Sequence, residues 1–261
     1  SSKAGFLGRW AYNCSKYKVF YTPHGFSFLI QDISKLKRIF YRLIEYFSAQ
    51  RKAVTIACGK GEYEEAKKLS GRCSYVSNGI NINKLNPFLK EKTSINAIPV
   101  VCTSGRISGQ KNPELFNEIA RLLPHVKFLW IGEGEMRTEL TAPNITITGW
   151  VSQETAIELT AKADFFLLPS RWEGFPISLL EAMYLKKICL VSDVIGNKDV
   201  IRNGQNGFIC HNTDEYVYRI NQIVNDKLNW KSATEQAHND VVSLYNTDIM
   251  AAEYEKNYHQ Y

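Results

Sequence analysis

The chain has 261 residues, of which 44% are hydrophobic and 22% are charged, as is ordinary for a globular protein with one large or two modest domains. No apolar run approaches the roughly 18 residues that a membrane-spanning helix needs. The net charge is +6, but residues 1–92 hold 17 Lys and Arg against 6 Asp and Glu, so this first part is basic. A basic surface suits an anionic lipid, a phosphorylated lipid acceptor or nucleic acid, and a merely solvated surface is the alternative.

Strand-like and helix-like segments alternate along the chain. The first part predicts strands at 18–22, 53–57 and 75–76 and helices at 34–49 and 62–69. A polar linker is expected at 84–94. A second series predicts strands at 99–103, 126–131, 145–148, 165–168 and 188–191. Its helices are expected at 113–123, after Gly132-Glu133-Gly134, at 154–161 and 177–184, and over most of 213–258.

This alternation predicts an α/β fold of parallel sheets that helices cover on both faces. Residues 93–244 contain the five or so strands of a complete doubly wound, Rossmann-like domain. Residues 1–92 contain only three, so we expect a second domain of this type that is incomplete at its beginning. The chain also opens without an initiator Met, which fits a fragment of a longer protein.

The six cysteines are scattered and form no C-x-x-C pair, which argues against disulfides and against a zinc site. Two of them lie in apolar, strand-like runs, so we expect small buried residues in a reducing compartment. The set comprises Cys14, Cys58, Cys73, Cys102, Cys189 and Cys210.

The predicted helix at 34–49 carries an apolar stripe at helical spacing, with a row of cations along its other side. The stripe comprises Leu36, Ile39, Phe40, Leu43 and Phe47, and the cations are Lys35, Lys37, Arg38 and Arg42. Such a stripe more often packs into a domain core than onto an anionic membrane. A core helix is therefore the favoured interpretation, and a membrane-facing helix is the alternative.

The most informative stretch runs from Glu173 through Gly174-Phe175-Pro176 to Glu181, after an apolar run at 164–169. The run predicts a buried strand, and Pro176 suits the first position of a helix, where a missing N–H costs nothing. Free backbone N–H groups and the positive end of the helix dipole then face outward between two carboxylates. A nucleotide-diphosphate sugar needs such donors for phosphate and such acceptors for hydroxyls. The alternative is that the two acids bracket a surface helix by chance.

The loop from Ser104 to Pro113 follows the first strand of the second series, where ligands bind in open α/β sheets. Gly105 lets the backbone come close to a ligand. Arg106 and Lys111 are five residues apart, and both can grip a pyrophosphate. Two exposed loop cations are the alternative.

Three further segments also end predicted strands. Gly132-Glu133-Gly134 is no dinucleotide fingerprint, because residue 137 is Arg, but it can wall the cleft. Gly149-Trp150-Val151 either reads a base edge or forms a simple turn. His24, flanked by Pro and Gly, lies in a turn from which its ring can project into the cleft, and a structural histidine is the equal alternative.

Together these segments resemble glycosyltransferase family 4, whose retaining enzymes have two Rossmann-like domains in the GT-B architecture. The resemblance is carried by Glu173 through Glu181 (the family's E-x7-E), Gly105-Arg106 with Lys111, Gly132-Glu133-Gly134 and Thr22-Pro23-His24-Gly25. Family members begin with further strands and a glycine-rich loop that shape the acceptor site. Their final helix often crosses back to the first domain, and residues 245–261 are expected to do so here.

The resemblance implies a role for each of these residues. Arg106 and Lys111 would bind the donor diphosphate. Glu173 would accept hydrogen bonds from the donor sugar, Glu181 would hold the ribose, and His24 would contact the sugar from the opposite domain. The remaining donor-binding positions would be Gly105, Gly132, Gly134, Val151, Gly174, Phe175, Pro176, Ser178 and Leu179.

The function implied is transfer of a sugar, with retention, from a nucleotide-diphosphate donor, expected to be a UDP-sugar, to a glycan or lipid-linked acceptor. The sequence has no Asp-x-Asp, in keeping with an enzyme that needs no metal or other cofactor. The expected setting is capsule or other surface polysaccharide synthesis in the cytoplasm, peripheral at the inner membrane face, without a nucleic-acid partner. The alternatives are a non-catalytic nucleotide-sugar-binding fragment or regulatory module, and an epimerase of the same fold.

Overall fold

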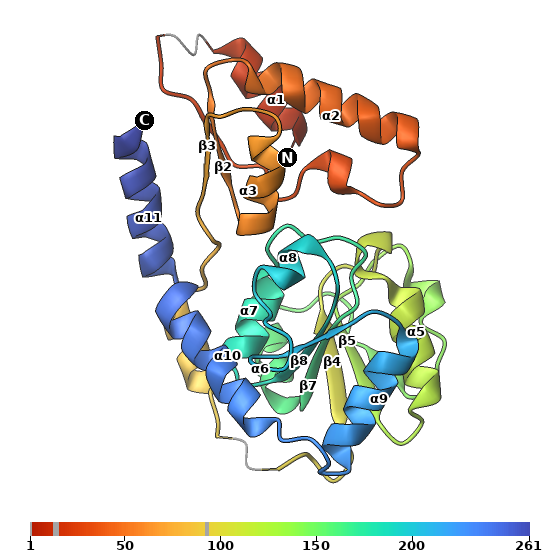
Figure 1. Cartoon of the computed structure of the whole chain (residues 1–261). Coiled ribbons are helices and arrows are strands. Elements are labelled where there is room, and N and C mark those ends of the chain that lie inside the picture. The colour runs from red at the N-terminus through yellow and green to blue at the C-terminus, as the bar shows by residue number, and fades with distance from the viewer. Residues whose placement is uncertain (1, 13–15, 92–93) are drawn as a thin grey trace.

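The structure is a computed structural model, and it describes residues 2–12, 16–91 and 94–261. Two parallel sheets form two units, which lie one above the other in Figure 1. The small unit has three strands in the order β1-β2-β3, and the large unit has six in the order β6-β5-β4-β7-β8-β9. In the small unit these are β1 (Phe20–Tyr21), β2 (Val54–Ala57) and β3 (Cys73–Tyr75). Cys14 and the expected boundary at residue 92 lie outside the described residues.

The sheet of the large unit is doubly wound. Its strands are β4 (Val100–Ser104), β5 (Lys127–Ile131), β6 (Ile145–Ile147), β7 (Phe165–Leu168), β8 (Ile188–Ser192) and β9 (Phe208–Cys210). All neighbours pair in parallel, and the strand order reverses between β4 and β7. In open sheets of this kind, a ligand binds beyond the carboxyl ends of the strands at such a reversal.

Helices cover both faces of this sheet, because its central strands are apolar on both sides. Phe165 and Leu167 of β7 pack beneath α5 (Pro113–Leu122) and α9 (Thr213–Val224). Phe166 and Leu168 point to the opposite face and pack beneath the other group of helices. That group comprises α6 (Gln153–Lys162), α7 (Ile177–Tyr184) and α10 (Lys231–Leu244).

The small unit is surrounded by α1 (Ser2–Ala11), α2 (Lys35–Ala49), α3 (Lys60–Lys67) and α11 (Thr247–Gln260). The C-terminal helix α11 runs beside β2 and β3 in Figure 1. Met250 and Tyr254 pack against the apolar cluster of this sheet, and the rings of Phe20 and Tyr258 lie 4.8 Å apart. The end of the chain therefore contacts the small unit, and the short helix α4 (Ile82–Leu85) lies on the segment between the two sheets.

Most predicted elements form within two residues of their expected bounds. Among the described residues, four further α-helices or strands were not predicted, namely α1, α4, the short helix α8 (Ile195–Lys198) and β9. The prediction of an α-helix opening at Gly132-Glu133-Gly134 is wrong, since only a 3-10 turn forms at Arg137–Glu139. The backbone of Gly134 lies so close to that of Ile107 that the segment is held against the loop after β4.

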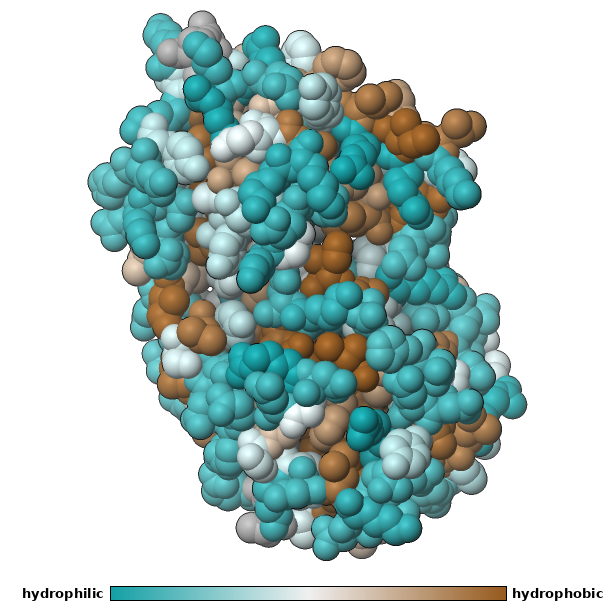
Figure 2. Space-filling model, in the orientation of Figure 1, coloured by the Kyte–Doolittle hydropathy of each residue, from teal (hydrophilic) through white to brown (hydrophobic). Residues whose placement is uncertain are grey.

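The core interpretation of the apolar stripe on α2 is also wrong. Leu36, Ile39, Phe40, Leu43 and Phe47 are 80%, 56%, 59%, 48% and 59% exposed. The helix instead buries Ser48, Ala49 and Glu45, and Glu45 accepts from Arg9 at 2.6 Å. The stripe is the brown region at the upper right of Figure 2.

Five described cysteines are buried, namely Cys58, Cys73, Cys102, Cys189 and Cys210. The burial of Cys102 and Cys189 was expected from their apolar, strand-like surroundings. Within the described ranges, no helix is long and apolar enough to cross a lipid bilayer.

Candidate functional site

A cavity of about 570 Å³ opens between the two units, beyond the carboxyl ends of β4 and β7. We call it the donor cavity. It brings together most of the residues that the sequence singled out. Those lining it are His24, Gly105, Lys111, Glu173, Gly174, Phe175, Pro176, Ser178 and Glu181, together with Asn78, Ser104, Gln110, Gln153, Ala156 and Ile177.

At the floor of the donor cavity, Lys111 and Glu173 form an ion pair of 2.6 Å. Their side chains are 16% and 6% exposed, so the pair is largely shielded from water. Glu173 also accepts from Ser170 Oγ at 2.6 Å and from Gln110 Nε2 at 3.3 Å. The carboxylate is thus held by three donors from the loops after β4 and β7, while the lysine supplies the positive charge at this edge of the sheet.

The N-terminus of α7 forms one wall of the cavity. Pro176 is the N-cap residue, one position before the expected one, and no side chain caps the helix. The first N–H groups of a helix have no partner within it, and they carry the positive end of the dipole. Ile177 and Ser178 belong to this first turn and line the cavity. The wall can therefore donate to an anion.

Glu181 lies one turn further along α7 and accepts from Gln153 Nε2 at 3.2 Å. Burial raises the pKa of the Glu181 carboxyl above its ordinary value, and the hydrogen bond from Gln153 partly opposes this shift. Glu181 and Glu173 thus lie in one cavity, one of them paired with a cation and the other with a neutral amide. Both can accept hydrogen bonds from hydroxyl groups.

From the small unit, the turn after β1 brings His24 into the cavity. His24 has φ 51° and Gly25 has φ 103°, so two consecutive residues adopt left-handed conformations. Glu62, which is fully buried, accepts from the N–H of Gly25 at 2.6 Å and from that of Cys58 at 2.9 Å. Because a non-glycine residue is strained in this region, these hydrogen bonds help to hold the turn.

The two units meet closely at this turn. A Cβ atom on Gly174 would lie 3.0 Å from the N atom of Gly25 and 3.1 Å from the carbonyl carbon of His24. Glycine at position 174 therefore lets the backbone of the Glu-Gly-Phe-Pro segment approach the His24 turn. Asn78 adds a second contact, since its Nδ2 donates to Phe175 O at 3.1 Å.

The structure places five predicted site residues away from the cavity wall. Leu179 is wholly buried in the core, and its N–H donates to Pro176 O at 3.2 Å, so its side chain does not line the cavity. A donor contact at this residue stays a prediction. Arg106 and Val151 are exposed, and neither lines the donor cavity. The roles expected for these two residues stay predictions.

Gly132 and Gly134 lie behind the cavity wall rather than in it. Gly132 has φ 141° and packs against the backbone of Gly105, and its N–H donates to Thr148 Oγ1 at 3.1 Å. Together with Gly134, it supports the loop that carries Lys111. A direct contact with the donor stays a prediction for both glycines.

Four residues that hold the side chains or the backbone of the site in place were not predicted. Ser170 and Gln110 orient Glu173, Gln153 binds Glu181, and Glu62 holds the His24 turn. Glu62 had a readable signal, because it is the third residue of α3 and reaches back to a backbone N–H before the helix, as the acid of a capping box does. The neutral partners carry no such pattern in the sequence. Among the described residues, no group of three or more His, Cys, Asp or Glu is arranged to hold a metal ion.

Comparisons with known proteins identify the family of the chain. Residues 87–240 match the family described as glycosyl transferases group 1. An Escherichia coli UDP-Gal:alpha-D-GlcNAc-diphosphoundecaprenol alpha-1,3-galactosyltransferase is 29% identical over 94% of this chain and 70% of its own length. A Campylobacter jejuni N,N'-diacetylbacillosaminyl-diphospho-undecaprenol alpha-1,3-N-acetylgalactosaminyltransferase is 27% identical over 71% of the chain and 54% of its own.

The fold is similar to that of Anabaena HepE in complex with UDP and glucose, with a TM-score of 0.83 over 100% of this chain and 76% of that one, at 17% identity. This likeness confirms the predicted α/β fold with parallel sheets of the GT-B type. Because the family match covers more than half of the sequence, this chain belongs to the glycosyl transferases group 1 family.

Proposed function

We propose that this chain binds the nucleotide-diphosphate part of a UDP-sugar in the donor cavity and transfers the sugar, with retention, to a glycan or lipid-linked acceptor. The observation that carries the proposal is the convergence of Lys111, Glu173, Glu181 and the uncapped start of α7 around one cavity. The names of the relatives agree with it, since the Escherichia coli protein is named for UDP-Gal and a diphosphoundecaprenol acceptor.

The proposed binding mode follows from the charges. A diphosphate at the start of α7 would offer Lys111 a new anionic partner in place of Glu173. Glu173 would keep Ser170 and Gln110 as donors and could accept from a sugar hydroxyl. Glu181, further along the same helix, would accept from the ribose.

In the proposed reaction, the bond between the sugar and the diphosphate breaks, and negative charge builds on the leaving group. The acceptor hydroxyl forms the new bond to the sugar, and its proton passes to the departing diphosphate. Lys111 and the dipole of α7 are positioned to stabilise that charge more strongly in the transition state than in the ground state. Arg106 leaves the same loop five residues before Lys111, and we propose that it also contacts the diphosphate. We further propose that these cations make a metal ion unnecessary, so EDTA should leave turnover unchanged.

The test is calorimetry with UDP on the wild type, Glu181→Ala and Arg106→Ala, followed by a transfer assay. We expect weaker UDP binding in both variants, with turnover lowered in Arg106→Ala. Glu158→Ala is the matched control, because Glu158 is an exposed acid on α6 that pairs only with Lys162 among the described residues. Unchanged UDP affinity in both site variants would remove the proposed cavity as the donor site. UDP binding without turnover would favour a non-catalytic binding fragment.

A further inference from the structure

A second cavity, of about 640 Å³, lies between α2 of the small unit and the loops after β7 and β8 of the large unit. We call it the acceptor cleft. Glu173 lines both this cleft and the donor cavity, so the two spaces adjoin at this residue. Because sugar transfer requires the donor and the acceptor to meet, a space that adjoins the donor cavity is positioned for the acceptor.

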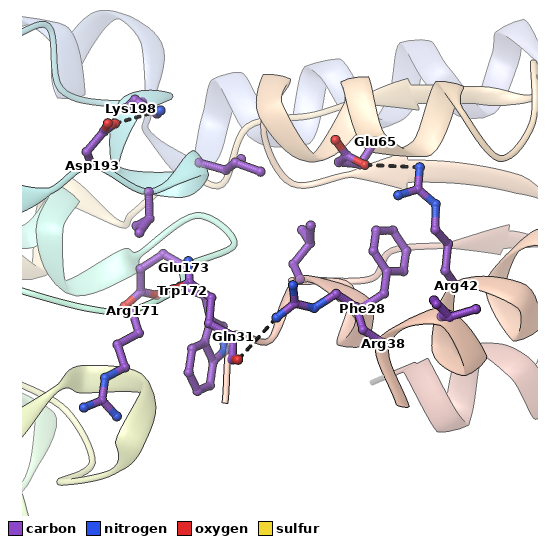
Figure 3. A pocket seen from close by; sticks show the side chains of 14 residues that line it. Phe28, Gln31, Arg38, Arg42, Glu65, Arg171, Trp172, Glu173, Asp193 and Lys198 are labelled. Atoms are coloured by element: carbon purple, nitrogen blue, oxygen red, sulfur yellow. Dashed lines mark hydrogen bonds and ion pairs between the residues drawn. The ribbon is translucent and has the colours of Figure 1, made fainter. Parts of the chain in front are cut away.

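The chemistry of the acceptor cleft changes along its length (Figure 3). At its inner end, Glu173 and the half-buried indole of Trp172 combine a hydrogen-bond acceptor with an aromatic face, a pair that suits a sugar. On the small-unit side, Arg38 and Arg42 extend from α2 toward the cleft.

The two arginines differ in how far their charges are neutralised. Arg38 donates to the carbonyl oxygens of Ile30 and Gln31, at 3.2 Å each, and no carboxylate pairs with it among the described residues. Arg42 lies 3.7 Å from Glu65, a long ion pair whose arginine side is 48% exposed. Positive charge therefore remains available midway along the cleft, where it can bind phosphate.

The outer end of the cleft leads onto the apolar stripe of α2. Ile39 lines the cleft and also belongs to the stripe, and the neighbouring Phe40 is 59% exposed. Exposed apolar residues of this number on one helix face mark a binding surface. The order from the inner end outward is thus carboxylate and indole, then cations, then an apolar helix face.

Resting on the proposed function, we infer that the acceptor is a glycosyl phosphate carried on a lipid. Its sugar lies against Glu173 and Trp172, its phosphate lies between Arg38 and Arg42, and the first part of its lipid lies along the stripe of α2. The three zones of the cleft match the three parts of such a molecule in the same order.

The experiment measures flotation of the chain with phosphatidylcholine vesicles that contain N-acetylglucosaminyl diphosphate on a polyprenyl lipid. We expect Arg38→Gln/Arg42→Gln to bind these vesicles about tenfold more weakly, since charged hydrogen bonds to phosphate are lost. Lys35→Gln is the control, because Lys35 is an exposed cation of the same helix that does not line the cleft, and it should change binding less than about twofold. An equal loss in the control would overturn the assignment.

Two further arms separate the possible ligands. Vesicles in which phosphatidylglycerol supplies the same charge should hold the wild type less well, and equal retention would show a general anionic membrane surface instead of this acceptor. A short-chain, water-soluble form of the same sugar diphosphate should bind Phe40→Ser and the wild type equally, whereas the vesicles should bind Phe40→Ser more weakly. Vesicle binding unchanged by Phe40→Ser would exclude the stripe as the lipid contact.

UDP calorimetry on every variant reports the donor cavity separately. Retained UDP affinity shows that the arginine variant is folded, and Arg42→Gln alone provides a milder change if the double variant does not fold. If the wild type did not bind UDP, the proposed function would be contradicted. Normal UDP binding with no effect of either arginine on the lipid probe would contradict only the inference about the acceptor.

Discussion

Lys111→Met separates the structural role of this lysine, as the partner of Glu173, from its proposed role as a contact for phosphate. The change leaves the Glu173 carboxylate, 6% exposed, with Ser170 and Gln110 as neutral donors. Removing one partner of a buried ion pair costs about 3–5 kcal/mol. Because Lys111 is itself 16% exposed and two donors remain, we expect a loss of about 3 kcal/mol in the free energy of unfolding.

The same variant should bind UDP about 10- to 100-fold more weakly, because a hydrogen bond to a charged group contributes about 1.5–3 kcal/mol. Adding Glu173→Gln removes the unpaired charge, so the double variant should recover most of the stability but none of the UDP affinity. Denaturant unfolding and calorimetry measure the two quantities. Lys162→Met, which breaks the exposed pair with Glu158, is the control and should cost less than about 1 kcal/mol. Wild-type stability in Lys111→Met, or restored UDP binding in the double variant, would refute this reasoning.

Three other predictions concern the contacts between the units and the His24 turn. Burial is the main cause that raises the pKa of Asp199 from 3.8 to about 6, while its carboxylate accepts from the N–H of Gly61 at 2.8 Å and 2.9 Å. A raised acid pKa favours the folded state below pH 3.8, and this contribution to the free energy of unfolding is lost as the pH rises through about 6. Asp199→Asn should therefore flatten the pH dependence of the free energy of unfolding between these two pH values. Gly174→Ala should lower the free energy of unfolding by about 1–3 kcal/mol, because the new Cβ atom would clash with the His24 turn. Gly71→Ala is the control and should not lower it in this way, because the new Cβ atom has open space around it. Equal thermal stability of the two variants would exclude the clash. Glu62→Gln should lower the free energy of unfolding by about 1–3 kcal/mol and speed amide hydrogen exchange at Gly25, because a carboxamide can accept only one of the two N–H bonds well. An unchanged exchange rate at Gly25 would contradict the role of Glu62 in holding the His24 turn.

Local sequence patterns predicted the position of several residues of the site. The apolar run before Pro169 predicts the buried strand β7, and the residues after it predict the turn into α7, so Glu173 and Glu181 were placed correctly at the two ends of the motif. Likewise, the loop after β4 is expected at the same edge of the sheet, because parallel strands all end on that side. The Rossmann-like order of the large unit follows from alternating strands and helices with short connections.

Contacts between distant segments were beyond such patterns. The ion pair of Lys111 and Glu173 joins residues 62 positions apart, and the sequence suggested that both would meet a ligand, not each other. The sequence also did not show which side chains of α7 face the cavity. Ser178 lines the cavity, but the next residue, Leu179, lies in the core, because one step along a helix turns a side chain by about 100°.

The amino-acid sequence was enough to predict the class of the fold and the chemical groups at the ends of its strands, because hydrophobic periodicity and turn residues act over a few neighbours. The exposed face of α2 and the contact of the His24 turn with Gly174 became visible only in the folded structure. An apolar stripe has the same spacing whether it faces a core, a lipid or water. What it contacts depends on the packing of units that are distant in the chain, and that packing is a property of the whole fold.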